Sequence, residues 1–365
     1  MGGVLITEPE AFDLNGPLPW GRLAIEASAG TGKTHTLCHL AVRYIAEADV
    51  AASAILLVTF TRAATAELRS RIREAIRDEI RRLEREVACA TPDNEVSNDL
   101  EHRLKNLRNA LTDFDSITIS TIHSFATQAI TAIGVTSKLD PPNGPTSEDT
   151  KLAESACTDA VVRAAASGVD RTLLPDSKAL LKAVNVATNS PDTIIEPPEL
   201  EGEPTAHTVL ASLVRTVVTT LRMRRQASDS ASFDDVLSGL REMVQSPDGA
   251  SAVALLRDRY RVVMIDEFQD TDPVQWGIFG TIFGDREVEP QAGREPTALV
   301  LVGDPKQAIY SFRGADISTY SGAVSEPGTR SVALATNWRS DGQLVDALGT
   351  LFSGVSFGRG IDYLQ

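Results

Sequence analysis

The residues of this chain best suited to chemistry are the eight from Ala27 to Thr34, which read Ala-Ser-Ala-Gly-Thr-Gly-Lys-Thr. An apolar run precedes them and a helix-like segment follows, so the pattern predicts a strand, a glycine-rich loop and a helix. The backbone N–H groups of such a loop and the positive end of the helix dipole converge on a bound polyphosphate. The stretch therefore predicts a nucleotide site, with a structural glycine turn as the alternative.

Individual positions of this loop have distinct chemical roles. Gly30 and Gly32 supply unhindered backbone, Lys33 reaches the β- and γ-phosphates, and the Thr34 hydroxyl is a ligand for Mg²⁺. The first position departs from the strict pattern, because it is alanine and not glycine. We therefore predict ATP and Mg²⁺ as cofactors, bound by Ala27, Ser28, Ala29, Gly30, Thr31, Gly32, Lys33 and Thr34.

Two adjacent acids follow a second apolar run, residues 262–265. Asp266 is predicted to hold Mg²⁺ through its water shell. Glu267, which we expect to face the other way along the strand, is predicted to orient or deprotonate the attacking water. A solvent-exposed acidic strand end is the alternative, and the phosphate loop makes it the weaker interpretation.

A third apolar run, residues 299–302, leads into a segment that carries Gln307. The carboxyl ends of parallel strands share one edge of a sheet, so Gln307 is placed to sense a γ-phosphate there. The exposed connection beyond it carries Tyr310, Phe312 and Arg313, which suit stacking on single-stranded bases. By composition alone, packing of these residues in the core explains them equally well.

The overall composition is that of a soluble globular protein with room for about two or three domains. Of its 365 residues 42% are hydrophobic, yet no run of eighteen apolar residues occurs. The amino terminus lacks the basic and apolar regions of a secretory signal, so we expect a cytoplasmic location and no membrane association. The net charge of −15 argues against coating nucleic acid by bulk attraction, although a local basic groove remains compatible with it.

Other arrangements of reactive side chains are weak candidates. The three cysteines are odd in number and far apart, which excludes a disulfide framework and a Cys-x-x-Cys metal site. His35, Cys38 and His39 share part of one helix face, but their place behind the phosphate loop favours packing against the sheet. His123 beside Ser124 lacks the Gly-x-Ser-x-Gly elbow of a hydrolase.

The elements that must position these residues alternate between buried strands and helices. Residues 55–58 form a continuous apolar run, typical of a parallel strand covered on both faces. From Ala63 to Val87 apolar residues recur every three or four positions, which predicts an amphipathic helix. Its other face is rich in arginine, and we interpret most of these arginines as a solvated face with i,i+4 ion pairs. We expect an α/β core interrupted by a mostly helical segment, residues 135–230.

In their order, these motifs resemble the UvrD/RecB branch of superfamily 1 helicases. The likeness covers nearly the whole chain and is weakest across residues 135–230. The segments that carry it are residues 26–34, 58–68, 120–125, 232–235, 265–271, 302–315 and 337–340. The resemblance implies an α/β fold with a RecA-like P-loop NTPase parallel sheet, a helical inserted domain and an incomplete second RecA-like domain. It also implies an ATP-dependent 3′→5′ DNA helicase subunit in recombinational double-strand-break repair.

The resemblance further implies roles for single residues. Glu267 would serve catalysis, Gln307 would couple the γ-phosphate to the DNA site, and Arg339 would approach the γ-phosphate from a second motor domain. Trp338 would stack on adenine, where this family often has tyrosine. Single-stranded or duplex-end DNA would be bound by Phe60, Arg62, Thr121, His123, Tyr310, Phe312 and Arg313. RecC- and RecD-like subunits are the implied partners.

The same likeness sets the expected domain boundaries. Residues 1–134 and 231–330 form the first motor domain, residues 135–230 the insertion, and residues 331–365 the start of a second motor domain. Neither the later family motifs, which include another arginine, nor a nuclease carboxylate cluster follow Ser340. We therefore expect an amino-terminal fragment that binds ATP and hydrolyses it poorly. The alternative is a non-translocating, ATP-dependent DNA-binding switch subunit.

Overall fold

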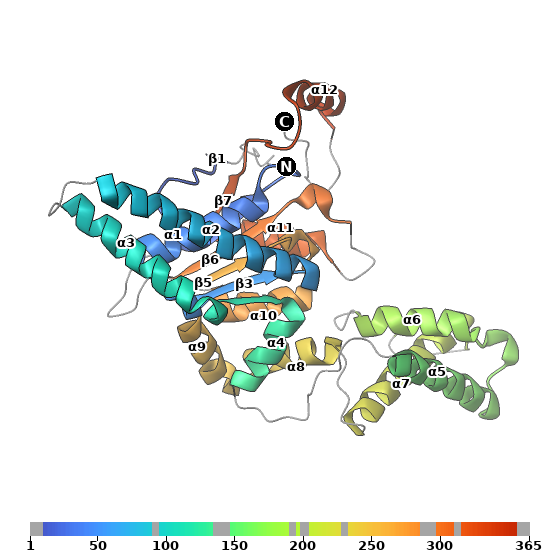
Figure 1. Cartoon of the computed structure of the whole chain (residues 1–365). Coiled ribbons are helices and arrows are strands. Elements are labelled where there is room, and N and C mark those ends of the chain that lie inside the picture. Colours follow the sequence, from blue (N-terminus) through green and yellow to red (C-terminus); the bar gives the residue numbers. More distant parts are fainter. Residues whose placement is uncertain are drawn as a thin grey trace. The chain divides into compact units, whose positions relative to one another are not determined.

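The computed structural model describes residues 10–89, 95–133, 147–189, 195–197, 204–227, 233–284, 297–309 and 315–355. The chain divides into two compact units, Met1–Phe125 with Pro247–Gln365, and Ala126–Ser246. The first unit holds a parallel sheet with helices on both faces, as Figure 1 shows.

Seven strands of the described residues form one sheet, and every neighbouring pair in it is parallel. The strand order is β1-β7-β2-β6-β5-β3-β4. The strands are β1 (Glu10–Ala11), β2 (Gly21–Glu26), β3 (Ile55–Thr59), β4 (Thr118–Thr121), β5 (Val262–Ile265), β6 (Ala298–Gly303) and β7 (Thr329–Ala333). This confirms the expected α/β fold with a RecA-like parallel sheet. It also places β6 between the strand before the phosphate loop and the strand before Asp266.

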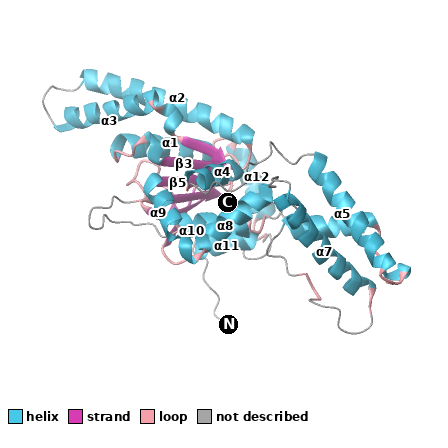
Figure 2. Ribbon diagram, turned by 90° about the horizontal axis from the view of Figure 1, so that it is seen from below, coloured by secondary structure: helices cyan, strands magenta, loops and turns pink. Residues whose placement is uncertain are grey.

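Helices cover both faces of the sheet, so β3, β5 and β6 are buried along their whole length. On one face, α1 (Lys33–Glu47), α2 (Arg62–Cys89) and α3 (Glu95–Thr112) pack with alternate strand residues in the main hydrophobic cluster. On the other face lie α9 (Ala250–Arg259) and α10 (Pro273–Phe283), as Figures 1 and 2 show. Burial on both faces explains why these strands are continuous apolar runs.

The arginine-rich face of α2 is solvated and held by ion pairs along the helix. Arg71 pairs with Glu67 at 2.7 Å, and Arg82 Nε donates to Glu79 at 2.8 Å. Arg81 pairs with the aspartate three residues before it. The interpretation of this face as a solvated, ion-paired surface is therefore confirmed for these arginines. Pairs of this kind contribute only a few tenths of a kcal/mol each.

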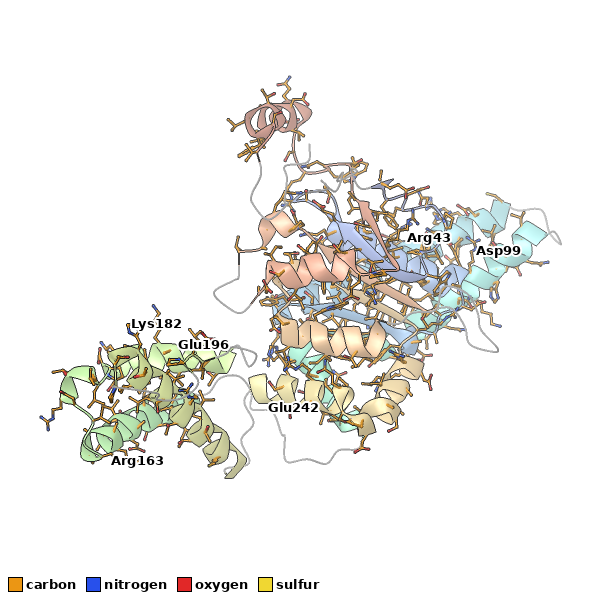
Figure 3. The ribbon with its side chains drawn as sticks, turned by 180° about the vertical axis from the view of Figure 1, so that it is seen from behind. Arg43, Asp99, Arg163, Lys182, Glu196 and Glu242 are labelled. Carbon is orange, nitrogen blue, oxygen red and sulfur yellow. The ribbon has the colours of Figure 1, made fainter. Side chains whose placement is uncertain are left out.

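The amino-terminal lead-in is tied to α1 by one arginine. Arg43, labelled in Figure 3, donates to the Leu14 carbonyl at 2.7 Å and pairs with Glu47 at 2.8 Å. Both contacts lie at the end of α1 away from the phosphate loop. They fix the helix without using any residue of the candidate site.

The second unit contains three helices packed around a small apolar core. These are α5 (Ser147–Ala166), α6 (Ser177–Asn189) and α7 (Ala206–Ala227), and their core is built from alanine, valine and leucine. The predicted helical character of residues 135–230 is confirmed in these helices, whereas an inserted domain with those boundaries remains a prediction. None of the described helices is both long enough and apolar enough to cross a bilayer.

Four further α-helices lie among the described residues. They are α4 (Ile122–Ala132), α8 (Phe233–Gln245), α11 (Ile317–Ser325) and α12 (Gly342–Phe352). Of these, α8 with most of α4 falls within the second unit. Strand β7 pairs with β2 and therefore belongs to the sheet of the first unit. The predicted domain boundary at residue 331 falls within this strand. A second motor domain that starts with residues 331–365 remains a prediction.

Candidate nucleotide site

Strand register brings three loops to one edge of the sheet. Glu26 at the end of β2 is opposite Gly303 at the end of β6, and Ile265 of β5 is opposite Leu301. The phosphate loop (residues 27–34), the 304–307 segment and the acids after β5 therefore leave the sheet side by side. Ligands of open parallel sheets bind at this carboxyl edge.

The phosphate loop has the backbone shape that its glycines permit. Gly30 and Gly32 have φ values of +84° and +93°, in the left-handed region that L side chains rarely adopt. Gly32 directly precedes α1, so the free N–H groups of the first helical turn open onto the loop. The Thr31 hydroxyl donates to the Ser28 carbonyl at 2.8 Å and closes the turn. This geometry suits an anionic phosphate.

The second of the two acids after β5 lies against the phosphate-loop lysine. Lys33 Nζ is 2.9 Å from Glu267 Oε2. Burial and the neighbouring Glu267 carboxylate raise the pKa of Asp266 to about 6. A divalent cation would favour the ionised form of such a buried carboxylate. The carboxylate of Asp266 and the hydroxyl of Thr34 are the oxygen donors that Mg²⁺ prefers, so these residue types fit that ion.

The backbone at the two acids differs from the extended strand that the sequence predicts. Strand β5 ends at Ile265, so strand alternation does not separate Asp266 from Glu267. Instead Glu267 has a φ of 51° and a ψ of 42°, a left-handed conformation that is uncommon for a residue with a side chain. Strained backbone of this kind costs on the order of 1–3 kcal/mol and is concentrated at functional sites.

The segment after β6 packs its polar side chains on one another. The Gln307 amide donates to Asp304 Oδ2 at 2.6 Å, and Asp304 is only 2% exposed. Lys306 pairs with Glu26 at 2.6 Å, across the ends of β6 and β2. Gln307 thus lies at the same edge as the phosphate loop, and its role toward a γ-phosphate remains a prediction.

Residues 337–340 dock directly on the phosphate loop. The Trp338 backbone N–H donates to the Gly30 carbonyl at 2.9 Å, and the Asn337 amide donates to the Ala29 carbonyl at 3.3 Å. Asn337 Oδ1 also accepts from the backbone N–H of Arg339 at 2.9 Å. A Cβ at position 30 would lie 2.7 Å from Asn337 Oδ1, so glycine is required for this approach. Trp338, which is 80% exposed, and Arg339 therefore lie beside the loop.

Four of the residues predicted to bind DNA lie on neighbouring strand ends. Phe60 and Arg62 follow β3, while Thr121 and His123 stand at the end of β4, and Thr59 is opposite Thr121 in the register. Burial lowers the pKa of His123, which keeps its ring neutral near pH 7. Tyr310, Phe312 and Arg313 lie outside the described residues.

The helix face that carries His35, Cys38 and His39 belongs to α1. The His35 and His39 rings stack at 5.9 Å between centroids along α1. Burial raises the pKa of the Cys38 thiol to about 12, so it stays a protonated core side chain. Among the residues that the structure describes, no cluster of three histidine, cysteine or carboxylate side chains could hold a metal ion.

Three side chains that organise the site lie in segments that carry the family resemblance, but no individual role is predicted for them from the sequence. Gln269, Asp304 and Asn337 are hydrogen-bonded to other loops of the site. Asn337 had a local signal, because an asparagine that accepts from the N–H two residues later is a frequent turn former. Gln269 had none, since its partners are set by the fold.

Asp270 carries a stability cost that depends on pH. It is 6% exposed, its Oδ1 has no hydrogen-bond partner, and burial raises its pKa to about 6. A raised carboxyl pKa stabilises the folded state below about pH 4, and this contribution is lost as the pH rises through 6. Asp270→Asn is therefore expected to raise the free energy of unfolding at pH 8 by about 1–3 kcal/mol and to change it little at pH 4.

Denaturant unfolding at a series of pH values measures this difference. Asp258→Asn is the control, because that carboxylate is solvent-exposed on α9. A stability gain for Asp270→Asn that is equal at pH 4 and pH 8 would contradict the expectation.

Comparison with known proteins gives one matching family and several relatives. The description of the family is "UvrD/REP helicase N-terminal domain", and it matches residues 17–327. RecBCD enzyme subunit RecB of Mycolicibacterium smegmatis is 36% identical over 354 residues, which cover 96% of this chain and 31% of that protein. The RecB subunit of Mycobacterium tuberculosis is 35% identical with the same coverage. That of Escherichia coli is 46% identical over 144 residues, 40% of this chain and 11% of that protein. The chain thus spans about a third of the length of its mycobacterial relatives.

Proposed function

Because the chain belongs to the UvrD/REP helicase family, we propose that it is the ATP-binding motor segment of a DNA helicase subunit that acts in recombinational double-strand-break repair. One observation carries this proposal. The phosphate-loop Lys33 lies 2.9 Å from Glu267. Asp266 and Glu267 are the first two residues after the buried strand β5. This brings a phosphate-binding cation, a metal-binding acid and a catalytic acid to one edge of the sheet.

ATP and Mg²⁺ are the ligands we assign to this edge. Residues 27–34 hold the phosphates through backbone N–H groups, and Lys33 supplies a positive charge. Thr34 and Asp266 hold the cation, and Trp338 offers a ring for adenine. When bound, Mg²⁺ neutralises charge that develops on the phosphate oxygens.

ATP hydrolysis requires a proton acceptor for the attacking water and positive charge near the transferred phosphoryl group. Glu267 accepts a proton from a water whose oxygen forms a bond to the γ-phosphorus. The bond between that phosphorus and the β–γ bridging oxygen breaks, which yields ADP and phosphate. Lys33 and Arg339 stabilise the negative charge of the transferred group. Gln307 couples the presence of the γ-phosphate to the conformation of the DNA site.

DNA is assigned to the edge beyond β5. Phe60, Arg62, Thr121 and His123 offer an aromatic face, a cation and two hydrogen-bonding groups to single-stranded or duplex-end DNA. We also assign Tyr310, Phe312 and Arg313 to DNA binding, on their residue types and the family resemblance alone. Translocation 3′→5′ would follow from closure of this domain on a second motor domain starting near residue 331.

The expected partners follow from the named relatives, each of which is a subunit of a RecBCD enzyme. We propose that this chain assembles with RecC- and RecD-like subunits in the cell. We also keep residues 1–134 and 231–330 as the first motor domain, and residues 135–230 as its insertion.

The test measures ATP hydrolysis and single-stranded DNA binding in the same preparation. We expect DNA to raise ATP turnover, and Arg62→Ala to weaken DNA affinity about five- to tenfold with a shallower salt dependence. Arg77→Ala is the matched control, because it removes an exposed arginine farther along α2.

Two outcomes would contradict the helicase proposal. ATP that changes DNA affinity without any turnover would support a non-translocating switch subunit. Turnover that DNA does not affect would remove the DNA assignment.

A further inference from the structure

Gln269 joins the two loops that carry the proposed catalytic acid and Gln307. It lies in the short helix η5 (Phe268–Asp270) and is 2% exposed. Its Nε2 donates to Glu267 Oε2 at 2.8 Å, while its Oε1 accepts from the Asp304 backbone N–H at 2.9 Å. Both ends of one buried amide are therefore used, each on a different loop.

The surroundings pack closely against this amide. A Cβ at position 303 would lie 2.9 Å from Gln269 Oε1 and 3.1 Å from the ring of Tyr320, so only glycine fits there. The backbone of η5 is closed by the Asp270 N–H, which donates to the Glu267 carbonyl at 2.9 Å. Phe268 is fully buried and packs against Tyr320 at 5.8 Å between ring centroids.

The hydrogen bonds continue from Gln269 toward the end of β6. Asp304, whose N–H is bound by Gln269, accepts from the Gln307 amide at 2.6 Å. An unbroken series of contacts therefore runs from the Glu267 carboxylate through Gln269 and Asp304 to Gln307. Hydrogen-bond networks whose members are satisfied hold them in one arrangement.

We propose that Gln269 is a positioning residue, which holds the Glu267 carboxylate and links it to the segment that carries Gln307. Glu267 Oε2 accepts from both Lys33 and Gln269, at 2.9 Å and 2.8 Å. A phosphate that drew Lys33 away would leave Gln269 as a donor already in place. The inference rests on the proposed function, because it assigns a partner to the proposed catalytic acid.

The first experiment measures single-turnover ATP hydrolysis and nucleotide affinity for Gln269→Leu, which keeps the size of the side chain and removes both hydrogen bonds. Loss of an outer-shell partner typically costs about 10–100-fold in activity, and we expect a rate loss of this size with an unchanged nucleotide Kd. Gln275→Leu is the matched control, since Gln275 is also buried and its Oε1 has no partner. A wild-type rate for Gln269→Leu would overturn the proposal.

A double-variant cycle separates positioning from a general loss of folding. If Gln269 acts through Glu267, adding Gln269→Leu to Glu267→Gln should slow hydrolysis no further. Equal slowing in both backgrounds would show that Gln269 acts independently of Glu267. The thermal unfolding midpoint of Gln269→Leu should stay well above the assay temperature, so that its rate is measured on folded protein.

A crystal structure of Gln269→Leu tests the inference even if the chain hydrolyses no ATP. We expect the Glu267 side chain to leave its position while Asp266 stays in place. A Glu267 carboxylate that keeps its wild-type position would overturn the positioning role whatever the activity. Absence of wild-type hydrolysis together with a displaced carboxylate would instead count against the proposed function alone.

Discussion

Replacement of Glu267 by glutamine is expected to lower the rate of ATP hydrolysis by about 10²–10⁴-fold, the usual contribution of a general base. The carboxamide keeps the size of the side chain and cannot accept a proton from water at neutral pH. Glu267 is a negative charge 2.9 Å from Lys33, at the edge where the phosphates are expected. Removing it should therefore leave ATP affinity unchanged or tighten it by up to about tenfold.

Single-turnover hydrolysis with excess protein measures this rate, because a slow enzyme still completes one turnover. Nucleotide affinity is measured on the same samples by calorimetry. Glu47→Gln is the matched control, since Glu47 is also a part-buried, ion-paired glutamate but lies at the far end of α1. Hydrolysis by Glu267→Gln within about threefold of wild type would remove Glu267 from the catalytic role.

Replacement of Lys33 by alanine is expected to weaken ATP affinity on the order of 10²-fold, because truncating a charged partner of this kind costs about 2–5 kcal/mol. The Lys33 side chain is 14% exposed and follows Gly32 at the start of α1. Its ammonium group is therefore held at the loop and does not swing through solvent. Protein stability should change little, since the Glu267 partner is 35% exposed and the pair is partly screened by water.

Lys306→Ala is the control for this loss of affinity. Lys306 is a second part-buried cation at this edge, with 13% of its side chain exposed and a Glu26 partner at 2.6 Å. Because Glu26 occupies it, we expect its removal to weaken ATP binding by less than about tenfold. Equal losses for the two variants would mean that general positive charge, and not the phosphate-loop lysine, binds the nucleotide. Calorimetric titration with a non-hydrolysable ATP analogue and Mg²⁺ measures both.

Part of this site is predictable because its signals are local. The glycines at positions 30 and 32 permit a turn with positive φ, and Lys33 and Thr34 follow within the same eight residues. Continuous apolar runs at 55–58 and 262–265 indicate strands covered on both faces, and parallel strands must end at one edge. Chain order and hydrophobic pattern were therefore enough to bring Lys33 to the edge where Glu267 lies.

Only the fold decided the contacts between residues that are distant in the chain. Gln269 meets the Asp304 backbone 35 residues away, and Asn337 meets the phosphate loop from 308 residues away. No periodicity predicts such contacts, because they depend on strand order and on the room that Gly30 and Gly303 leave.

The backbone of Glu267 shows the same limit at short range. The amino-acid pattern correctly predicts two acids after an apolar strand, yet it suggests that strand alternation turns them apart. The strand stops one residue earlier, and a left-handed turn at Glu267 directs its carboxylate to Lys33. Sequence thus determined which chemical groups reach the edge of the sheet. The tertiary structure decided how these groups face one another. A non-glycine residue such as Glu267 keeps a strained backbone conformation only where the packing of the folded protein around it holds it there.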